Sequence, residues 1–240
     1  MPQAAANGSK RSSWGFSGAG QPSSPQGTLA IYGDRIYGTT KNGGTGGAGT
    51  VFELAPPTVE GGSWTETTLH TLTGENGDGI SPYAGVVVDA NGVLYGTTEL
   101  GGAQPCDHNG CGVVFSLTPP SAPGGTWTET ILHTFTGENG DGVTPYAGVT
   151  LGPNGVLYGT TAGGGAIRND SCGAGCGVVF ELVPPSSQGG TWTEVILHNF
   201  DGSDGNEPYA GVTMGPEGTL YGTTVFGGTS NQGTVFSLVP

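Results

Sequence analysis

The pentapeptide LYGTT, at Leu94–Thr98, Leu157–Thr161 and Leu220–Thr224, decides the fold of this chain. The three copies are 63 residues apart, and a near-copy, IYGTT, stands at Ile36–Thr40. A longer unit recurs around each copy: PYAGV, a turn, YGTT, a glycine-rich loop, a VVFxL-like segment, a Pro-Pro/Gly-Gly stretch and TWTExxLHxF. A repeat of this length is typical of an array of similar units. We therefore expect residues present in every copy to be structural, and residues present in one or two copies to be better functional candidates.

The composition indicates a turn-rich, acidic protein and argues against some classes of partner. Among 240 residues, 50 are Gly and 17 are Pro, which indicates many turns between patterned apolar segments. Only 10% of residues are charged, and the net charge of −14 argues against nucleic acid or an anionic membrane as a partner. No apolar run reaches the ~20 residues of a membrane span, so we expect no membrane insertion. The N-terminus lacks the apolar core of a signal peptide.

One repeat unit reads as four antiparallel strands. In the third unit we expect strands over 147–151, 156–161, 177–183 and 191–200. The turn at 152–155 contains Asn-Gly, which readily adopts positive φ, and the two prolines after the third strand end it. Four such strands joined by hairpin loops describe the blade of an all-β propeller.

The units predict a single domain over 1–240, a four-bladed β-propeller. Residues 1–26 are read as a closing strand and lead-in, and the blades as 27–83, 84–146, 147–209 and 210–240. The last blade lacks its fourth strand, and residues 13–18 (SWGFSG) align with 132–137 (LHTFTG) of an outer strand. We therefore expect the N-terminus to complete the last blade and close the ring within a monomer. The alternatives are a longer ring formed with a second chain and a fragment of a larger propeller.

The sequence of the repeat unit resembles that of a known family. PYAGVTLGPNGVLYGTT at 145–161, GVVFEL at 177–182 and ILHTF at 131–135 are similar to the GloVer-type (choice-of-anchor) tandem repeats of extracellular bacterial proteins. The resemblance covers roughly 27–240 and implies an exported β-propeller. It implies no catalytic residues, and the chain departs from it in its cysteine-bearing loops.

The four cysteines form two local pairs, each inside one glycine-rich loop. Cys106 pairs with Cys111 and Cys172 with Cys176 if they are oxidised, and no CxxC spacing indicates a zinc site. Two loop disulfides are the preferred interpretation and predict an oxidising, extracellular location. The alternative is four free thiols in a cytosolic protein.

Acidic residues recur in the loops between units: Glu75, Asp78, Glu138, Asp141 and Asp204. Their oxygens are suitable ligands for Ca²⁺, the one cofactor that we consider. The alternative is that Asn-Gly and Asp-Gly simply form turns there. The strand histidines His70, His133 and His198 recur as well, and we read them as packing or hydrogen-bonding residues.

Two further sets of residues are candidates for ligand binding. Tyr83, Tyr146 and Tyr209 precede the innermost strands, where they either fill the space between blades or line the mouth of the ring. The two cysteine loops carry residues found in no other unit: Asp107, His108, Arg168 and Asp170. We expect these loops to lie side by side on one face, where they either bind a ligand or form solvated tips.

These features favour an extracellular binding module that recognises a glycan or a cell-surface component without catalysis. The first alternative is a secreted polysaccharide hydrolase or lyase that uses Asp107, His108, Arg168 and Asp170 as acid/base groups. The second is a structural unit of an extracellular assembly. No GxSxG, HExxH or phosphate-binding loop motif is present.

Overall fold

The computed structural model describes residues 14–16, 21–59, 62–102, 106, 109–122, 124–170, 172–187 and 189–240. This part of the chain is all-β apart from two single-turn 3-10 helices, η1 (Pro153–Gly155) and η2 (Pro216–Gly218). None of its helices has the length and apolar character needed to cross a membrane. The strands are β1 (Ala30–Tyr32), β2 (Arg35–Thr40), β3 (Thr50–Ala55), β4 (Thr65–Thr71), β5 (Gly79–Ile80), β6 (Val87–Val88), β7 (Leu94–Thr98), β8 (Leu100–Gly101), β9 (Val113–Thr118), β10 (Thr128–Thr134), β11 (Gly142–Val143), β12 (Thr150–Leu151), β13 (Leu157–Thr161), β14 (Gly163–Gly164), β15 (Val178–Val183), β16 (Thr193–Asn199), β17 (Thr213–Met214), β18 (Leu220–Thr224) and β19 (Thr234–Leu238).

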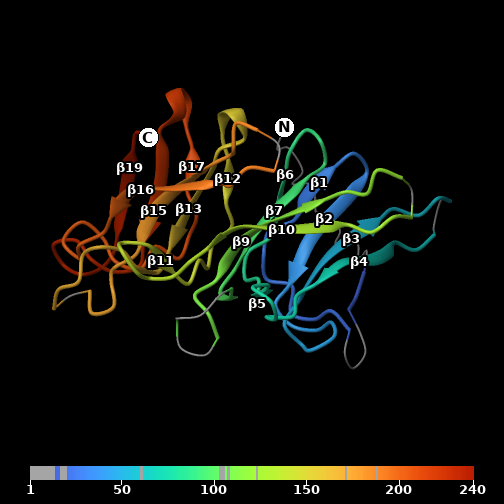
Figure 1. The fold of residues 1–240 in the computed structure, drawn as a ribbon, viewed down its shortest axis with the longest axis horizontal. Helices are drawn as coiled ribbons and strands as arrows, with labels where there is room; N and C mark the ends of the chain where they lie inside the picture. The colour runs from blue at the N-terminus through green and yellow to red at the C-terminus, as the bar shows by residue number, and fades with distance from the viewer. Residues whose placement is uncertain are drawn as a thin grey trace, which may run out of the picture.

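Each repeat unit builds its own antiparallel sheet. Units 1 to 4 begin at residues 27, 84, 147 and 210, and their strand orders are β1-β2-β3-β4, β6-β7-β9-β10, β12-β13-β15-β16 and β17-β18-β19. The sheets succeed one another along the long axis of the molecule, from β1 to β19 (Figure 1). The four strands expected in unit 3 are confirmed, although the innermost is only the two residues of β12.

The fourth unit ends at β19, which pairs only with β18 among the described residues. No described strand joins unit 4 to unit 1, so the described sheets are separate rather than one closed sheet. The predicted closing strand at 13–18 is described only at Trp14–Phe16, which form no strand. Val235 of β19 is 82% exposed, as expected of an edge strand without a neighbour.

The YGTT motif serves packing both within and between units. A Cβ on Gly159 would lie 2.4 Å from Phe180 Cζ, so only glycine leaves room for that ring across the β13–β15 ladder. Thr160 Oγ1 donates a hydrogen bond to the Ala210 carbonyl oxygen of the next unit at 3.0 Å. Thr39 and Thr97 make the same bond to Ala84 and Ala147. The first threonine of the motif thus ties each of units 1 to 3 to its successor.

Aromatic side chains fill the space between successive sheets. Phe135 follows β10 and meets Phe180 of unit 3 edge-on, with ring centroids 5.2 Å apart. Trp192 of unit 3 packs on Tyr95 of unit 2 with centroids 6.3 Å apart, and Trp127 packs on Tyr37 in the same way. The cores therefore lie between neighbouring units, and a unit alone would leave one apolar face uncovered.

Two short ladders define the face that carries the loops. β5 pairs with β8 and β11 pairs with β14, so each loop between units lies against the loop that follows the second strand of the next unit. We call the surface formed by the described residues of the loops at 73–83, 99–112, 136–146, 162–177 and 201–209 the loop face.

Candidate functional site

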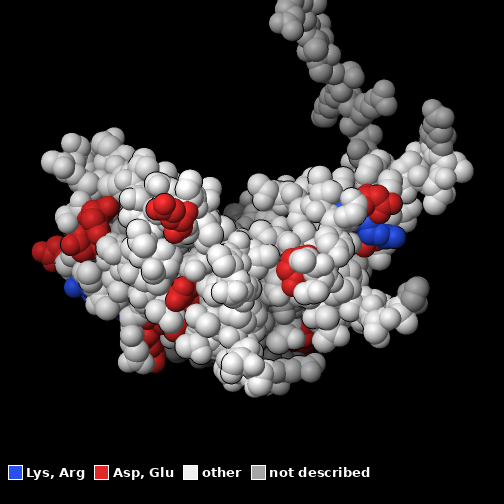
Figure 2. All heavy atoms as spheres, turned by 90° about the horizontal axis from the view of Figure 1, so that it is seen from above, with Lys and Arg blue, Asp and Glu red and all other residues white. Residues whose placement is uncertain are grey.

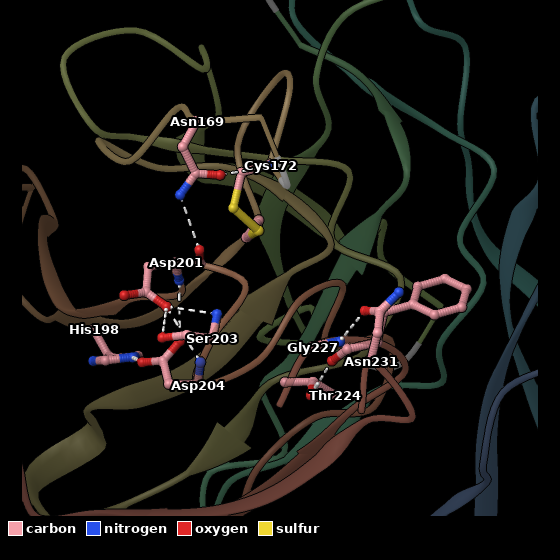
Figure 3. The surroundings of a disulfide bond; sticks show 11 residues. Asn169, Cys172, His198, Asp201, Ser203, Asp204, Thr224, Gly227 and Asn231 are labelled. Carbon is pink, nitrogen blue, oxygen red and sulfur yellow. Dashed lines mark hydrogen bonds and ion pairs between the residues drawn. A yellow bond between two sulfur atoms is a disulfide. The ribbon is translucent and has the colours of Figure 1, made fainter. Parts of the chain in front are cut away.

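Both predicted disulfides are present on the loop face. The Cα atoms of Cys106 and Cys111 are 5.2 Å apart and those of Cys172 and Cys176 are 4.7 Å apart, within the usual range. Asn169 fixes the second loop at its base (Figure 3). Its Oδ1 accepts from the Cys172 backbone N–H at 2.9 Å, and its Nδ2 donates to the Asp201 carbonyl at 3.0 Å. The disulfide loop of unit 3 is therefore tied to the following inter-unit loop.

The two disulfide loops lie beside each other, as expected. Arg168 Nη2 donates to the Gly137 carbonyl oxygen at 2.7 Å. The guanidinium of unit 3 therefore contacts the loop between units 2 and 3, which lies next to the disulfide loop of unit 2. A hollow of about 570 Å³ is lined by Cys106 and Cys111 on one side and Arg168 on the other. Asp170 is exposed. Asp107 and His108 lie outside the described residues.

The three candidate tyrosines form a continuous row. Tyr83 meets Tyr146 with centroids 5.2 Å apart, and Tyr146 meets Tyr209 at 4.9 Å, both edge-on. Lys41 donates to the hydroxyl of Tyr83, and its Nζ lies 4.0 Å from the ring centroid. The rings are in contact with one another along the loop face, and Tyr209, at 47% exposure, is the most open of them.

A hollow opens where the residue after YGTT is small. Lys41 and Glu99 hold this position in units 1 and 2 and reach the next tyrosine, since the Tyr146 hydroxyl donates to Glu99 Oε1 at 2.9 Å. Unit 3 has Ala162 there. A hollow of about 340 Å³ takes up this space, lined by Ala162, Tyr146, Tyr209 and the disulfide loop of unit 3. Unit 3 thus departs from units 1 and 2 at this position, and the departure leaves open volume beside two aromatic rings that a ligand could contact.

The in-phase aspartates clamp their own turns. Asp141 Oδ2 accepts from both the backbone N–H and the hydroxyl of Thr136, each at 2.7 Å. Asp78 makes the equivalent pair of bonds to Thr73 at 2.7 and 2.8 Å. The turn-forming role is therefore present whether or not a cation binds.

The same aspartates also face histidine and glutamate side chains across the boundary between units. His70 Nε2 lies 3.7 Å from Asp78 Oδ1 and 3.4 Å from Glu129 Oε2 of unit 2. In the next boundary His133 Nε2 lies 3.4 Å from Asp141 Oδ1 and 3.5 Å from Glu194 Oε1. We call these two sets the boundary triads. Glu75 and Glu138, expected as calcium ligands, belong to neither triad.

Burial and charge shift the pKa values in the triads. Burial raises the pKa of Glu129 to about 7, because the attraction of His70 offsets only part of it. Burial likewise raises the pKa of Glu194 to about 7. Burial alone would lower the pKa of His70, but contact with Asp78 and the charge of Glu129 outweigh it and raise that pKa. Burial would raise the pKa of Asp78, yet its contacts with His70 and Thr73 hold that pKa below its usual value.

The third boundary departs from this pattern. His198 Nε2 and Asp204 Oδ2 are 2.7 Å apart, a short charge-assisted hydrogen bond (Figure 3). Asp204 Oδ1 also accepts from the Asp201 backbone N–H at 3.0 Å. Both side chains are more exposed than their counterparts, at 36% and 41%. No glutamate of the described residues joins this pair.

Comparison with known proteins agrees with the repeat. The model of the Gloeobacter/Verrucomicrobia repeat family matches residues 24–240. The chain belongs to this family. No curated protein matches it. This match confirms the repeat family that the sequence motifs indicated.

In this Gloeobacter/Verrucomicrobia repeat protein, sequence reasoning missed the glutamates of the boundary triads. Glu129 and Glu194 lie in the TWTE segment, and the histidines that they face lie in the outer strand of the preceding unit. The available signal was that an outer-strand histidine, a loop aspartate and this glutamate all recur with the unit. Nothing in one strand's own pattern indicates that they meet across a boundary.

Proposed function

We propose that this repeat protein is an extracellular binding module whose loop face recognises a glycan or a cell-surface component. The observation that carries the proposal is the row of Tyr83, Tyr146 and Tyr209 beside a hollow of about 340 Å³. Tyrosine offers an apolar ring with a polar tip, which suits a sugar because its faces carry C–H groups and its rim carries hydroxyls. A row of rings suits successive sugars of a polymer.

Charge supports a neutral ligand. Figure 2 views the molecule from above Figure 1, the side away from β5 and β11, and there the acidic residues form separate groups rather than one patch. The chain's net charge of −14 disfavours an anionic polymer over a neutral one. Among the described residues lining the hollow, Glu207 is the single carboxylate. Glycoside hydrolysis generally needs a pair of carboxylates, which favours binding over the alternative of a secreted hydrolase.

The extracellular assignment rests on the two disulfides. Disulfides in a chain of this size persist mainly in oxidising environments outside the cytosol. Cys111 and Cys176 are nearly inaccessible, with 1% and 0% exposure, so both bridges are built into the loop bases. The export implied by the sequence resemblance points the same way.

The finer architecture that we propose is a four-bladed propeller closed by the N-terminus. Among the described residues β19 has no partner on its outer edge, whereas each other unit covers the equivalent edge with an outer strand. Phe16 packs edge-on against Phe52 of unit 1, as Phe135 packs against Phe180 of unit 3. A segment that places Phe16 there supports an outer strand over 13–18, which would cover β19.

Binding is tested on an array of neutral and acidic glycans, with a parallel screen for cleavage of the polysaccharides that bind. We expect Tyr146→Ala and Tyr209→Ala to lose at least tenfold in affinity for the bound glycan, because each removes a ring from the row. Tyr221→Ala is the matched control, since Tyr221 is 46% exposed but lies outside the row. Equal affinity in all three variants would contradict the proposed site, and cleavage would favour the hydrolase alternative.

A further inference from the structure

We infer that the two boundary triads, His70–Asp78–Glu129 and His133–Asp141–Glu194, are binding sites for a transition-series divalent cation such as Zn²⁺. Each triad supplies one imidazole nitrogen and two carboxylate oxygens, and these ligand atoms lie within 4.8 Å of one another. Nitrogen and oxygen donors together are typical of zinc sites. Ca²⁺ requires six to eight oxygen ligands, which three side chains that include a histidine do not provide.

The spacing of the donors fits a four-coordinate ion. Bonds of about 2.0–2.2 Å at tetrahedral angles place neighbouring ligand atoms about 3.3–3.6 Å apart. The histidine nitrogens stand 3.4 and 3.7 Å from their carboxylate oxygens in the first triad, and 3.4 and 3.5 Å in the second. Charge-assisted hydrogen bonds between the same groups would be about 2.7–2.9 Å long.

Unsatisfied polar atoms point to the same sites. His70 Nε2, Glu129 Oε1 and Glu194 Oε1 are buried and have no hydrogen-bond partner among the described residues. Burying such atoms without a partner costs free energy, and a cation would satisfy His70 Nε2 and Glu194 Oε1, which are among the ligand atoms of the triads. The two histidine side chains as a whole keep 23% and 20% exposure, so the triads lie near the surface although the ligand atom His70 Nε2 is itself buried.

The third boundary acts as an internal comparison. His198 and Asp204 occupy the equivalent positions, but no described glutamate faces them. The distance between His198 Nε2 and Asp204 Oδ2 is 2.7 Å. Where a described glutamate is present, the histidine and aspartate atoms are 3.7 Å apart in the first triad and 3.4 Å apart in the second, the latter a long hydrogen bond. Where no glutamate is described, they form a short hydrogen bond of 2.7 Å. We therefore expect metal at the first two boundaries and none at the third.

A metal at these positions would join the units. Each triad takes two ligands from one unit or its following loop and one from the outer strand of the next unit, so the ion would bridge neighbouring sheets. The inference is independent of the proposed glycan site, because none of the triad residues lines the hollow beside Tyr209.

The test uses the full chain without an affinity tag, stripped with a chelator and titrated with Zn²⁺ by calorimetry. We expect two equivalents per chain, and one equivalent in each of Glu129→Gln and Glu194→Gln. Glu66→Gln is the matched control: Glu66 holds the same place in the outer strand of unit 1 but belongs to neither triad, and it should leave two equivalents. Titration with Co²⁺ should give the intense visible absorption of four-coordinate cobalt.

Melting curves recorded without metal show whether each variant is folded, so a lost equivalent is read only from folded protein. Zn²⁺ should raise the Tm of the parent chain, and by less in each glutamine variant. No saturable binding of Zn²⁺ or Co²⁺, or two equivalents retained in both glutamine variants, would overturn the inference. Preferential binding of Ca²⁺ at the same stoichiometry would overturn it as well.

Discussion

Phe16 packs edge-on against Phe52, with ring centroids 5.2 Å apart and an interplanar angle of 70°. Phe200 packs on Phe236 at the same 5.2 Å, and in that case the first ring belongs to the residue after an outer strand and the second to the third strand of the next unit. Phe16 therefore occupies the place that the end of a preceding outer strand would occupy. This relationship links the N-terminal segment to the first unit in the same way that units 2 and 3 are linked to their successors.

Deleting residues 1–18 should destabilise the protein by several kcal/mol if they cover β19 and close the ring. Phe16→Ala alone should cost roughly 1–3 kcal/mol, because the ring is only half-buried. Urea unfolding measures both, and size-exclusion chromatography should show the deletion variant associating through its free edge. A truncated chain that stays monomeric and melts within about two degrees of the parent contradicts closure.

Replacing Cys172 and Cys176 by Ser should lower the free energy of unfolding by about 2 kcal/mol or less, because the bridge closes a loop of only a few residues. The same variant should also bind the glycan more weakly, because Cys172 lines the hollow beside Tyr209. The Cys106/Cys111 double serine variant is the control, with a similar loss of stability but unchanged affinity. Mass spectrometry of the unreduced parent should find only the two local pairings.

Glu217→Asn should stabilise the protein by about 0.5–1 kcal/mol. Glu217 is exposed and held at φ 60°, a left-handed conformation that a glutamate adopts at a cost and an asparagine more readily. Unit 3 has Asn154 at φ 58° in the equivalent turn. The reciprocal change, Asn154→Glu, should lose a similar amount in urea unfolding. Equal stability of both variants and the parent would show that these turns are not strained.

Stability should fall as pH rises from about 10 toward 12. Burial and a nearby carboxylate raise the pKa of Tyr37, Tyr95 and Tyr146 to about 12, whereas unfolded tyrosine titrates near 10. A raised pKa in the folded state means that the stabilisation is full below pH 10 and is lost as these phenols ionise. Ultraviolet titration should show them ionising late. Asp89→Asn should lower the pKa of Tyr95 only in part, because burial is the larger cause.

The sequence alone determined the parts of this protein that are local in the chain. The three copies of LYGTT, together with IYGTT at 36–40, indicated four units. Runs of apolar residues bounded by Gly and Pro predicted strands close to β13, β15 and β16. The disulfides followed from pairs only five and four residues apart. Such features could be predicted because their geometry depends on neighbouring residues and because repetition shows each pattern several times.

The tertiary structure decided what lies between units. Whether Tyr146 meets Tyr209, whether Ala162 leaves a hollow, and whether Glu129 reaches His70 all depend on how one sheet is rotated and shifted against the next. Those offsets are set by packing of whole faces and by bonds such as Thr160 to Ala210, not by the periodicity of any strand. The candidate binding and metal sites therefore arise at the boundaries, where residues more than fifty positions apart come within bonding distance.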